Sequence, residues 1–302
     1  MPVLEIRNLT KRFGDFTAVD SISFAVKRGE IVGLLGPNGA GKTTTIHMLL
    51  GITLKNGGSI TYFGRDFYHH RLESLQRINS SSAFNTLLGR ITVKENLRVF
   101  AALYRVDDAD RIIDELLKRF EIADLAHELY WGLSSGQRTR VNLIKSLLND
   151  PEIILMDEPT ASLDPDIADK TLSLIEELRS ERNLSILYTS HNMAEITRIC
   201  DNVIFLDHGK IVANDTPANL TKRISSATLR LTFSGARSTI ESYLHGRGQR
   251  FSFTSENTVE ISSEESLIPE LLFGASHVGN AITDIEIRKP TLEDVFIQIA
   301  RA

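Results

Sequence analysis

The pattern of apolar and polar residues predicts a domain in which strands and helices alternate. Residues 3–9 and 18–26 alternate apolar and polar side chains, as half-buried strands do, with a turn expected at 11–14. Continuous apolar runs typical of buried strands lie at 31–35, 153–156, 184–188 and 203–206, and helical patterns lie at 42–50, 138–148, 167–179 and 193–200. This alternation indicates an α/β fold with a mostly parallel sheet and crossover helices.

The middle of the chain lacks this alternation. A hairpin with a strand at 59–63 and a polar, serine-rich loop at 79–85 precede two amphipathic helices, predicted at 93–104 and 111–120. We therefore expect a helical subdomain, at about 68–150, inserted into the α/β core.

Residues 225–302 show a separate pattern. Short alternating segments and two helical pieces follow one another in the order βαββαβ, which indicates a small ferredoxin-like α+β domain. A terminal helix is predicted after Pro290, with Thr291 as its N-cap. The predicted organisation is one domain at 1–222 and a C-terminal domain at 225–302.

One stretch predicts a phosphate site. Residues 36–44 read GPNGAGKTT and fit G-x-x-x-x-G-K-[ST], between an apolar strand and a helix. Backbone N–H groups and a helix N-terminus then converge on one point, which suits an anion. In this motif Lys42 reaches the β- and γ-phosphates and the Thr43 hydroxyl binds Mg²⁺. A glycine-rich turn without a ligand is the alternative, but the Lys-Thr pair at the right offset favours a site for a nucleoside triphosphate.

Polar side chains at the ends of two predicted strands extend this site. Asp157 and Glu158 follow the apolar run at 153–156, at the strand end where α/β sheets bind ligands. We expect Asp157 to hold Mg²⁺ and Glu158 to orient or deprotonate a water, although such a pair can also cap a helix. His191 follows the next strand and could contact the γ-phosphate. The adjacent His69 and His70 are better explained by a solvated turn than by a metal, since no further ligand lies at suitable spacing.

Composition restricts the class of protein. The chain has 302 residues, 42% of them apolar and 24% charged, as in an ordinary soluble globular protein. Its net charge of −5 argues against a nucleic-acid partner. The single cysteine, Cys200, excludes an intrachain disulfide and is predicted to be an inert core thiol in a reducing cytoplasm. No apolar run approaches the roughly 18 residues that span a bilayer, and no signal peptide is recognised, so a membrane role requires a partner.

Five motifs in one order resemble those of the ATP-binding-cassette ATPases over residues 3–222. These are GPNGAGKTT at 36–44, LSSGQ at 133–137, IILMDEP at 153–159, ASLD at 161–164, and His191. The resemblance implies a P-loop NTPase core with an antiparallel β subdomain and a helical subdomain. It also implies a head-to-tail dimer that encloses ATP and Mg²⁺ between two subunits.

The resemblance assigns roles to individual residues. Phe13, which by its position could equally be a packing aromatic, falls where the family stacks the base. The implied ATP-binding residues are Phe13, Gly36, Pro37, Asn38, Gly39, Ala40, Gly41, Lys42, Thr43 and Thr44 of one subunit, and Ser134, Gly136, Gln137 and Asp164 of the other. The implied catalytic residues are Glu158, His191 and Lys42, and the implied metal ligands are Thr43 and Asp157.

Some positions depart from the family or have a simpler explanation. Ser134 could serve only as a helix N-cap. Ser135 replaces a glycine of the family signature, a substitution between small residues. The glutamine that contacts the metal in the family would fall at or near Ala83, which cannot bind Mg²⁺, and Asn85 is the nearest amide. Either the metal takes an extra water or coupling through this loop differs.

The predicted function is the ATPase subunit of an ABC-2-type transporter. The sequence PTLEDVF at 290–296 resembles the C-terminal extension of such subunits, where the extra domain either stabilises a dimer or regulates it. The expected partners are separately encoded membrane-spanning subunits and a second ATPase copy, at the cytoplasmic face of the membrane. The alternative is a soluble ABC ATPase of translation or DNA maintenance, which the acidic charge, the single cassette and the lack of a sustained heptad pattern disfavour.

Overall fold

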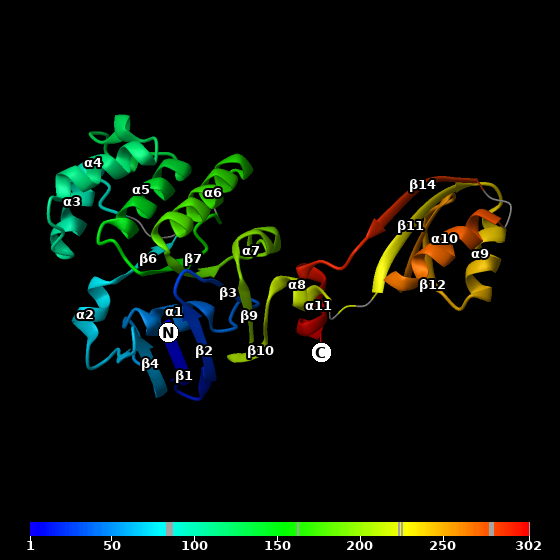
Figure 1. Cartoon of the computed structure of the whole chain (residues 1–302), viewed down its shortest axis with the longest axis horizontal. Coiled ribbons are helices and arrows are strands. Elements are labelled where there is room, and N and C mark those ends of the chain that lie inside the picture. Colours follow the sequence, from blue (N-terminus) through cyan, green and yellow to red (C-terminus); the bar gives the residue numbers. More distant parts are fainter. Residues whose placement is uncertain (83–86, 162, 223, 225, 278–280, 302) are drawn as a thin grey trace. The chain divides into compact units, whose positions relative to one another are not determined.

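A computed structural model describes residues 1–82, 87–161, 163–222, 224, 226–277 and 281–301. The chain divides into two compact units, Met1–Pro217 and Ala218–Ala302 (Figure 1). Among the residues described, no helix combines the length and the apolar character needed to cross a bilayer.

The first unit begins with an antiparallel sheet. Its strands are β1 (Pro2–Phe13), β2 (Phe16–Lys27), β4 (Gly57–Tyr62) and β5 (Arg65–Asp66), in the order β2-β1-β4-β5. The turn predicted at 11–14 is wrong, because Arg12 and Phe13 still pair with Thr17 and Phe16. The strands of this hairpin therefore extend as far as Phe13 and Phe16.

The second sheet of this unit is mostly parallel, as predicted. Its strands are β3 (Ile31–Leu35), β6 (Ile78–Ser82), β7 (Ile153–Asp157), β8 (Ser185–Thr189), β9 (Asn202–Asp207) and β10 (Lys210–Asp215), in the order β10-β9-β3-β8-β7-β6. Only β10 runs antiparallel to its neighbour. Residues 78–82, expected to lie mostly in a polar loop, form the edge strand β6. All of them except Ile78 are polar, and they still form a strand because β6 pairs along its whole length with β7 and the Asn79 side chain bonds to Asn149.

Helices cover the sheets and form a separate cluster (Figure 1). They are α1 (Lys42–Leu49), α2 (Arg71–Gln76), α3 (Val93–Leu103), α4 (Ala109–Arg119), α5 (Ser135–Leu147), α6 (Pro165–Arg182) and α7 (Met193–Ile199), with short 3₁₀ turns at Ala123–Leu125 and Tyr130–Gly132. The short helix α8 (Pro217–Thr221) begins at the boundary between the two units. Helices α3, α4 and α5 pack on one another and form the helical part of the unit. One core holds the rest together, because Ile46 and Leu49 of α1 share a cluster with residues of both sheets.

The second unit has the predicted βαββαβ order. Its elements are β11 (Ser226–Ser234), α9 (Arg237–Gly246), β12 (Arg250–Ser255), β13 (Thr258–Glu264), a 3₁₀ turn at Glu265–Leu267, α10 (Ile268–His277), β14 (Ala281–Arg288) and α11 (Leu292–Arg301). The strands are all antiparallel, in the ferredoxin-like order β12-β13-β11-β14. Thr291 caps α11, since its Oγ1 accepts a hydrogen bond from Asp294 N at 3.3 Å.

A buried lysine joins the helical part to the edge strand β6. Lys145 of α5 donates from Nζ to the Ser80 carbonyl at 2.7 Å and to Asn79 Oδ1 at 3.3 Å. Burial lowers the pKa of Lys145 from 10.5 to about 8. At a pH between these two pKa values, Lys145 carries a proton in the unfolded chain but has lost it in the folded chain. The free energy of unfolding therefore rises with pH over this range.

We expect this titration to appear in the pH dependence of stability. Between a pH below 8 and about pH 10.5, the free energy of unfolding of the wild type should rise by roughly 1–3 kcal/mol more than that of the variant Lys145→Met. Urea denaturation of both proteins at several pH values measures this difference. Parallel pH profiles for the two proteins would contradict the lowered pKa of Lys145.

Candidate active site

The loop between β3 and α1 is shaped to admit an anion. Gly36 has φ 150° and Gly41 has φ 104°, which side-chain-bearing residues rarely adopt. A Cβ atom would lie 2.2 Å from the Leu206 carbonyl oxygen at Gly36, and 2.4 Å from the Ala18 carbonyl oxygen at Gly41. The loop is thus held tightly against β9 and β2. Gly41 is also the N-cap of α1 and has no side chain to cover the free N–H groups of the first turn.

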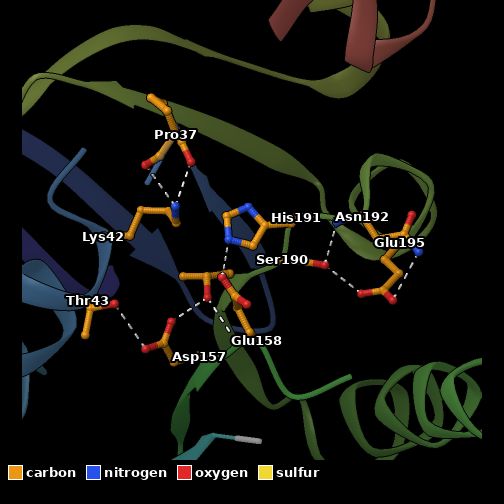
Figure 2. Close-up of polar contacts among 11 residues, drawn as sticks. Pro37, Lys42, Thr43, Asp157, Glu158, Ser190, His191, Asn192 and Glu195 are labelled. Carbon is orange, nitrogen blue, oxygen red and sulfur yellow. Dashed lines mark hydrogen bonds and ion pairs between the residues drawn. The ribbon is translucent and has the colours of Figure 1, made fainter. Parts of the chain in front are cut away.

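Lys42 is buried inside this loop. Its side chain is only 7% exposed, and its Nζ donates to the carbonyl oxygens of Gly36 at 2.6 Å and Pro37 at 3.2 Å (Figure 2). Burial lowers the pKa of Lys42, while the nearby carboxylates of Glu158 and Asp157 act in the opposite direction. A phosphate at the loop would replace neutral carbonyl partners with an anionic one and would stabilise the charged lysine.

Asp157 joins three elements at the end of β7. Its Oδ1 accepts a hydrogen bond from Thr189 Oγ1 of β8 at 2.7 Å, and its Oδ2 lies 3.5 Å from Thr43 Oγ1 of α1 (Figure 2). The groups that gather here are a carboxylate and hydroxyls, the hard oxygen ligands that Mg²⁺ prefers. The residues present therefore fit the predicted metal.

Glu158 and His191 meet beside the loop. His191 Nε2 lies 2.6 Å from Glu158 Oε1 (Figure 2). Glu158 has a left-handed backbone with φ 51°, a conformation that costs energy for residues other than glycine. Its N–H donates to both the carbonyl oxygen and Oγ1 of Thr189, at 3.1 and 3.0 Å. These backbone bonds to β8 fix the position of Glu158, whose carboxylate contacts His191.

A cleft of about 250 Å³ lies over the loop. Its lining consists of Phe13, Phe16, Ala18, Pro37, Asn38, Gly39, Ala40, Gly41, Lys42, Thr43, Thr44 and Glu158. Phe13 is 52% exposed, so its ring is available to a ligand and is not a core residue. Phe16, also exposed, was not predicted. It reaches the cleft because it pairs with Phe13 across the hairpin turn, a register that the hydrophobic pattern alone does not show.

Other predicted site residues lie away from this cleft. Ser134 is the N-cap of α5, where it forms a capping box with Gln137. Gln137 N donates to Ser134 Oγ at 3.3 Å, and Ser134 N donates to Gln137 Oε1 at 2.8 Å. Neither residue lines the cleft, nor do Gly136 and the exposed Asp164 at the start of α6. Ala83 and Asn85, whose position raised a question about the metal, lie outside the described residues.

The remaining candidates have local structural roles. His69 Nδ1 lies 2.8 Å from Asp66 Oδ1 and His70 Nδ1 lies 3.6 Å from Glu73 Oε2, both on a solvent-exposed turn. Cys200 is buried, and burial raises the pKa of its thiol, which keeps it protonated and unreactive.

Comparison with known proteins identifies the family. The sequence pattern of the ABC transporter family matches residues 19–161. The chain is 38% identical over 224 residues to Nod factor export ATP-binding protein I of Ralstonia nicotianae, covering 72% of this chain and 68% of the relative. It is 33% identical over 299 residues to a fluoroquinolones export ATP-binding protein of Mycobacterium tuberculosis, covering 98% and 93%. This chain belongs to the ABC transporter family.

Further comparisons also agree with an ABC ATPase. The linearmycin resistance ATP-binding protein LnrL of Bacillus subtilis is 30% identical over 306 residues, covering 98% of each chain. A solved structure described as the ATP binding subunit of an ABC transporter superposes with a TM-score of 0.67 at 26% identity, covering 73% of this chain and 92% of the other. The predicted resemblance and the P-loop NTPase fold are therefore confirmed, and ATP is the nucleotide that this ABC ATPase binds and hydrolyses.

Proposed function

We propose that this chain is the ATP-hydrolysing subunit of an ABC-2-type exporter. The observation that carries the hydrolytic part of the proposal is the 2.6 Å contact between His191 and Glu158 beside the phosphate loop. Export is supported by the relatives named for it, one of which is similar along 98% of this chain and thus also across the second unit. The alternative, a soluble ABC ATPase of translation or DNA maintenance, has no observation in its favour.

ATP would bind along the cleft over the loop. The base stacks on Phe13, and the phosphates accept hydrogen bonds from the backbone of residues 36–44. Lys42 exchanges its carbonyl partners in the loop for phosphate oxygens. Thr43 and Asp157 would hold Mg²⁺, which supplies positive charge next to the phosphates.

Hydrolysis would use the two groups at the strand ends. A water molecule attacks the γ-phosphorus, its proton passes to the Glu158 carboxylate, and the bond to the β–γ bridging oxygen breaks. His191 contacts the γ-phosphate, which places the phosphate next to Glu158 because the two side chains touch. Glu158 thus orients the water and accepts its proton, as a general base does.

A second copy of the chain would complete the site. The cleft contains one side of a nucleotide site, while Ser134, Gly136 and Gln137 lie elsewhere in the same chain, at the start of α5. In a head-to-tail dimer these residues would close on the γ-phosphate of the partner subunit, and Asp164 would lie across the interface. Ser134 and Gln137 would then exchange hydrogen bonds to each other for bonds to the phosphate.

Membrane-spanning subunits would dock on a groove between the sheet and the helical part. This groove has a volume of about 340 Å³ and is lined by Leu50, Leu72, Leu75, Gln76, Ile78, Asn79, Ser80, Phe100, Leu103 and Tyr104. Leu72 is 83% exposed and Leu103 is 67% exposed. An apolar groove of this kind suits a cytoplasmic helix of a permease, which would place the chain peripherally at the cytoplasmic face of the membrane.

Copurification tests the proposal. The tagged chain is isolated from detergent-solubilised membranes and assayed for phosphate release from ATP. We expect a membrane-spanning partner in stoichiometric amount. Ribosomes or DNA in its place would favour the soluble alternative.

The groove gives a more specific prediction. Leu72→Asp combined with Leu103→Asp should abolish copurification of the permease, because two charges would be buried in an apolar contact. ATP hydrolysis by the purified chain should stay within about twofold of the wild type, since neither residue lines the cleft. Leu54→Asp, at a residue that is also 68% exposed but outside the groove, is the matched control. Normal copurification by the double variant would exclude this groove as the docking site.

A further inference from the structure

A buried carboxylate lies behind the Glu158–His191 pair. Glu195, on α7, is only 6% exposed and belongs to none of the five family motifs. Its Oε2 accepts three hydroxyl hydrogen bonds, from Thr160 Oγ1 at 2.8 Å, Tyr188 OH at 2.9 Å and Ser190 Oγ at 2.8 Å. Its Oε1 accepts a fourth, from Asn192 Nδ2 at 3.3 Å. Figure 2 shows Ser190 and Asn192 directed toward this carboxylate.

The four donors come from the segments that carry the two proposed catalytic residues. Thr160 lies two residues after Glu158 on the loop that follows β7. Ser190 and Asn192 lie immediately before and after His191. Hydrogen bonds to one carboxylate therefore connect the segment that carries Glu158 with the segment that carries His191.

The hydrogen bonds of this network have a fixed direction. The three hydroxyls are the donors and the carboxylate oxygen of Glu195 is the acceptor, so each hydroxyl points its hydrogen toward Glu195. Burial and the adjacent Glu195 raise the pKa of Tyr188, which keeps that hydroxyl a donor. Ser190 Oγ in turn accepts from Asn192 N at 3.0 Å, and Asn192 Oδ1 accepts from Ala194 N at 3.0 Å. The backbone on both sides of His191 is thus held by bonds that depend on Glu195.

A buried carboxylate is costly unless its partners compensate it, and here they are neutral. Among the ion pairs of the described residues, none includes Glu195. Desolvation therefore works against the fold and is offset by the hydroxyl donors. A buried network whose polar groups are all hydrogen-bonded restricts the relative positions of the groups that it joins.

We propose that Glu195 is a positioning residue that holds Glu158 and His191 in the geometry needed for hydrolysis. This inference rests on the catalytic roles proposed for those two residues. A catalytic group displaced by about 1 Å can lose about a hundredfold in rate. In the described part of the chain no hydrogen bond joins the network to the phosphate loop, and that loop and Phe13 provide most of the proposed contacts to ATP, so the affinity for ATP should change little.

Variants that each remove one hydrogen bond to Glu195 test the proposal in the full-length chain. Thr160→Val removes the bond on the Glu158 side, and Ser190→Ala removes one of the bonds on the His191 side and leaves that of Asn192. Each should lower kcat for ATP hydrolysis by about 10–100-fold and leave the Kd for ATP within about twofold. Glu195→Gln should lower kcat less than Glu195→Ala does, because an amide oxygen can still accept hydrogen bonds from the three hydroxyls. The bond from Asn192 Nδ2 would be lost, because the NH₂ group of glutamine is also a donor.

Matched controls separate positioning from general stability. Thr171→Val and Ser146→Ala remove buried hydroxyls that, within the described residues, bond only to a carbonyl of their own helix, and should leave kcat unchanged. Thermal unfolding of every variant is measured alongside. The inference is overturned if Thr160→Val and Ser190→Ala keep the wild-type kcat. It is also overturned if kcat falls only in parallel with a weaker affinity for ATP and a lower thermal stability. Normal turnover by Glu158→Gln in the same assay would instead withdraw the catalytic assignment on which the inference rests.

Discussion

Glu158→Gln should bind ATP with normal affinity and hydrolyse it about 10²–10⁴-fold more slowly than the wild type. Glutamine has the shape of glutamate, and the backbone bonds from residue 158 to Thr189 do not involve the side chain. The amide can still contact His191 but cannot accept the proton of the attacking water. Thr43 and Asp157 are unchanged, so metal and phosphate binding should persist. Steady-state phosphate release and a titration with ATP measure the two effects separately.

The same variant should accumulate as a dimer in the presence of Mg²⁺ and ATP. In the proposed dimer, closure would need only the nucleotide and reopening would need hydrolysis, so a slow hydrolysis step should raise the dimeric fraction seen by size-exclusion chromatography. Glu177→Gln, at an exposed residue of α6, is the matched control and should remain like the wild type. Turnover at the wild-type rate would rule out Glu158 as the base, and another group would then have to accept the proton.

Much of the fold follows from local patterns in the sequence. The apolar runs of β3, β7, β8 and β9 are continuous because both faces of these strands are buried in a parallel sheet. The edge strand β6 was missed for the opposite reason. Its asparagine and serines give no apolar run, and its conformation depends on pairing with β7, which lies 75 residues later (Ile78 pairs with Ile153). Register between distant strands is a tertiary property that the local pattern does not contain.

The same difference between local patterns and tertiary contacts applies to the candidate site. Lys42, Thr43, Asp157, Glu158 and His191 could be predicted because each follows a strand or opens a helix in a recognisable motif. Their convergence agrees with the rule that parallel strands place their carboxyl ends at one edge. Glu195 could not be predicted, because a glutamate on a short helix has no local signal of burial. Only the packing of α7 against β8 and the loop after β7 reveals its partners.

Lys42→Met should weaken ATP binding by about a hundredfold, in contrast to Glu158→Gln. The ammonium group is placed in the loop, where it would form charge-assisted hydrogen bonds to the phosphates, each worth about 1.5–3 kcal/mol. Methionine fills similar space without the charge. Burial already lowers the pKa of Lys42, so removing the charge relieves a desolvation cost in the free protein. Thermal stability without nucleotide should therefore fall little, and calorimetric titration with ATP should show the lost affinity in a folded protein.

Lys145→Met is the control for this experiment, because it also replaces a buried lysine by methionine. Lys145 bonds to β6 and does not line the cleft, so the Kd for ATP should be that of the wild type. Together the two lysine variants separate the loss of any buried charge from the loss of the charge in the phosphate loop. If both weaken ATP binding equally, the effect comes from the fold and not from a phosphate contact. If only Lys42→Met does, while Glu158→Gln still binds, then binding and hydrolysis depend on different residues of one cleft.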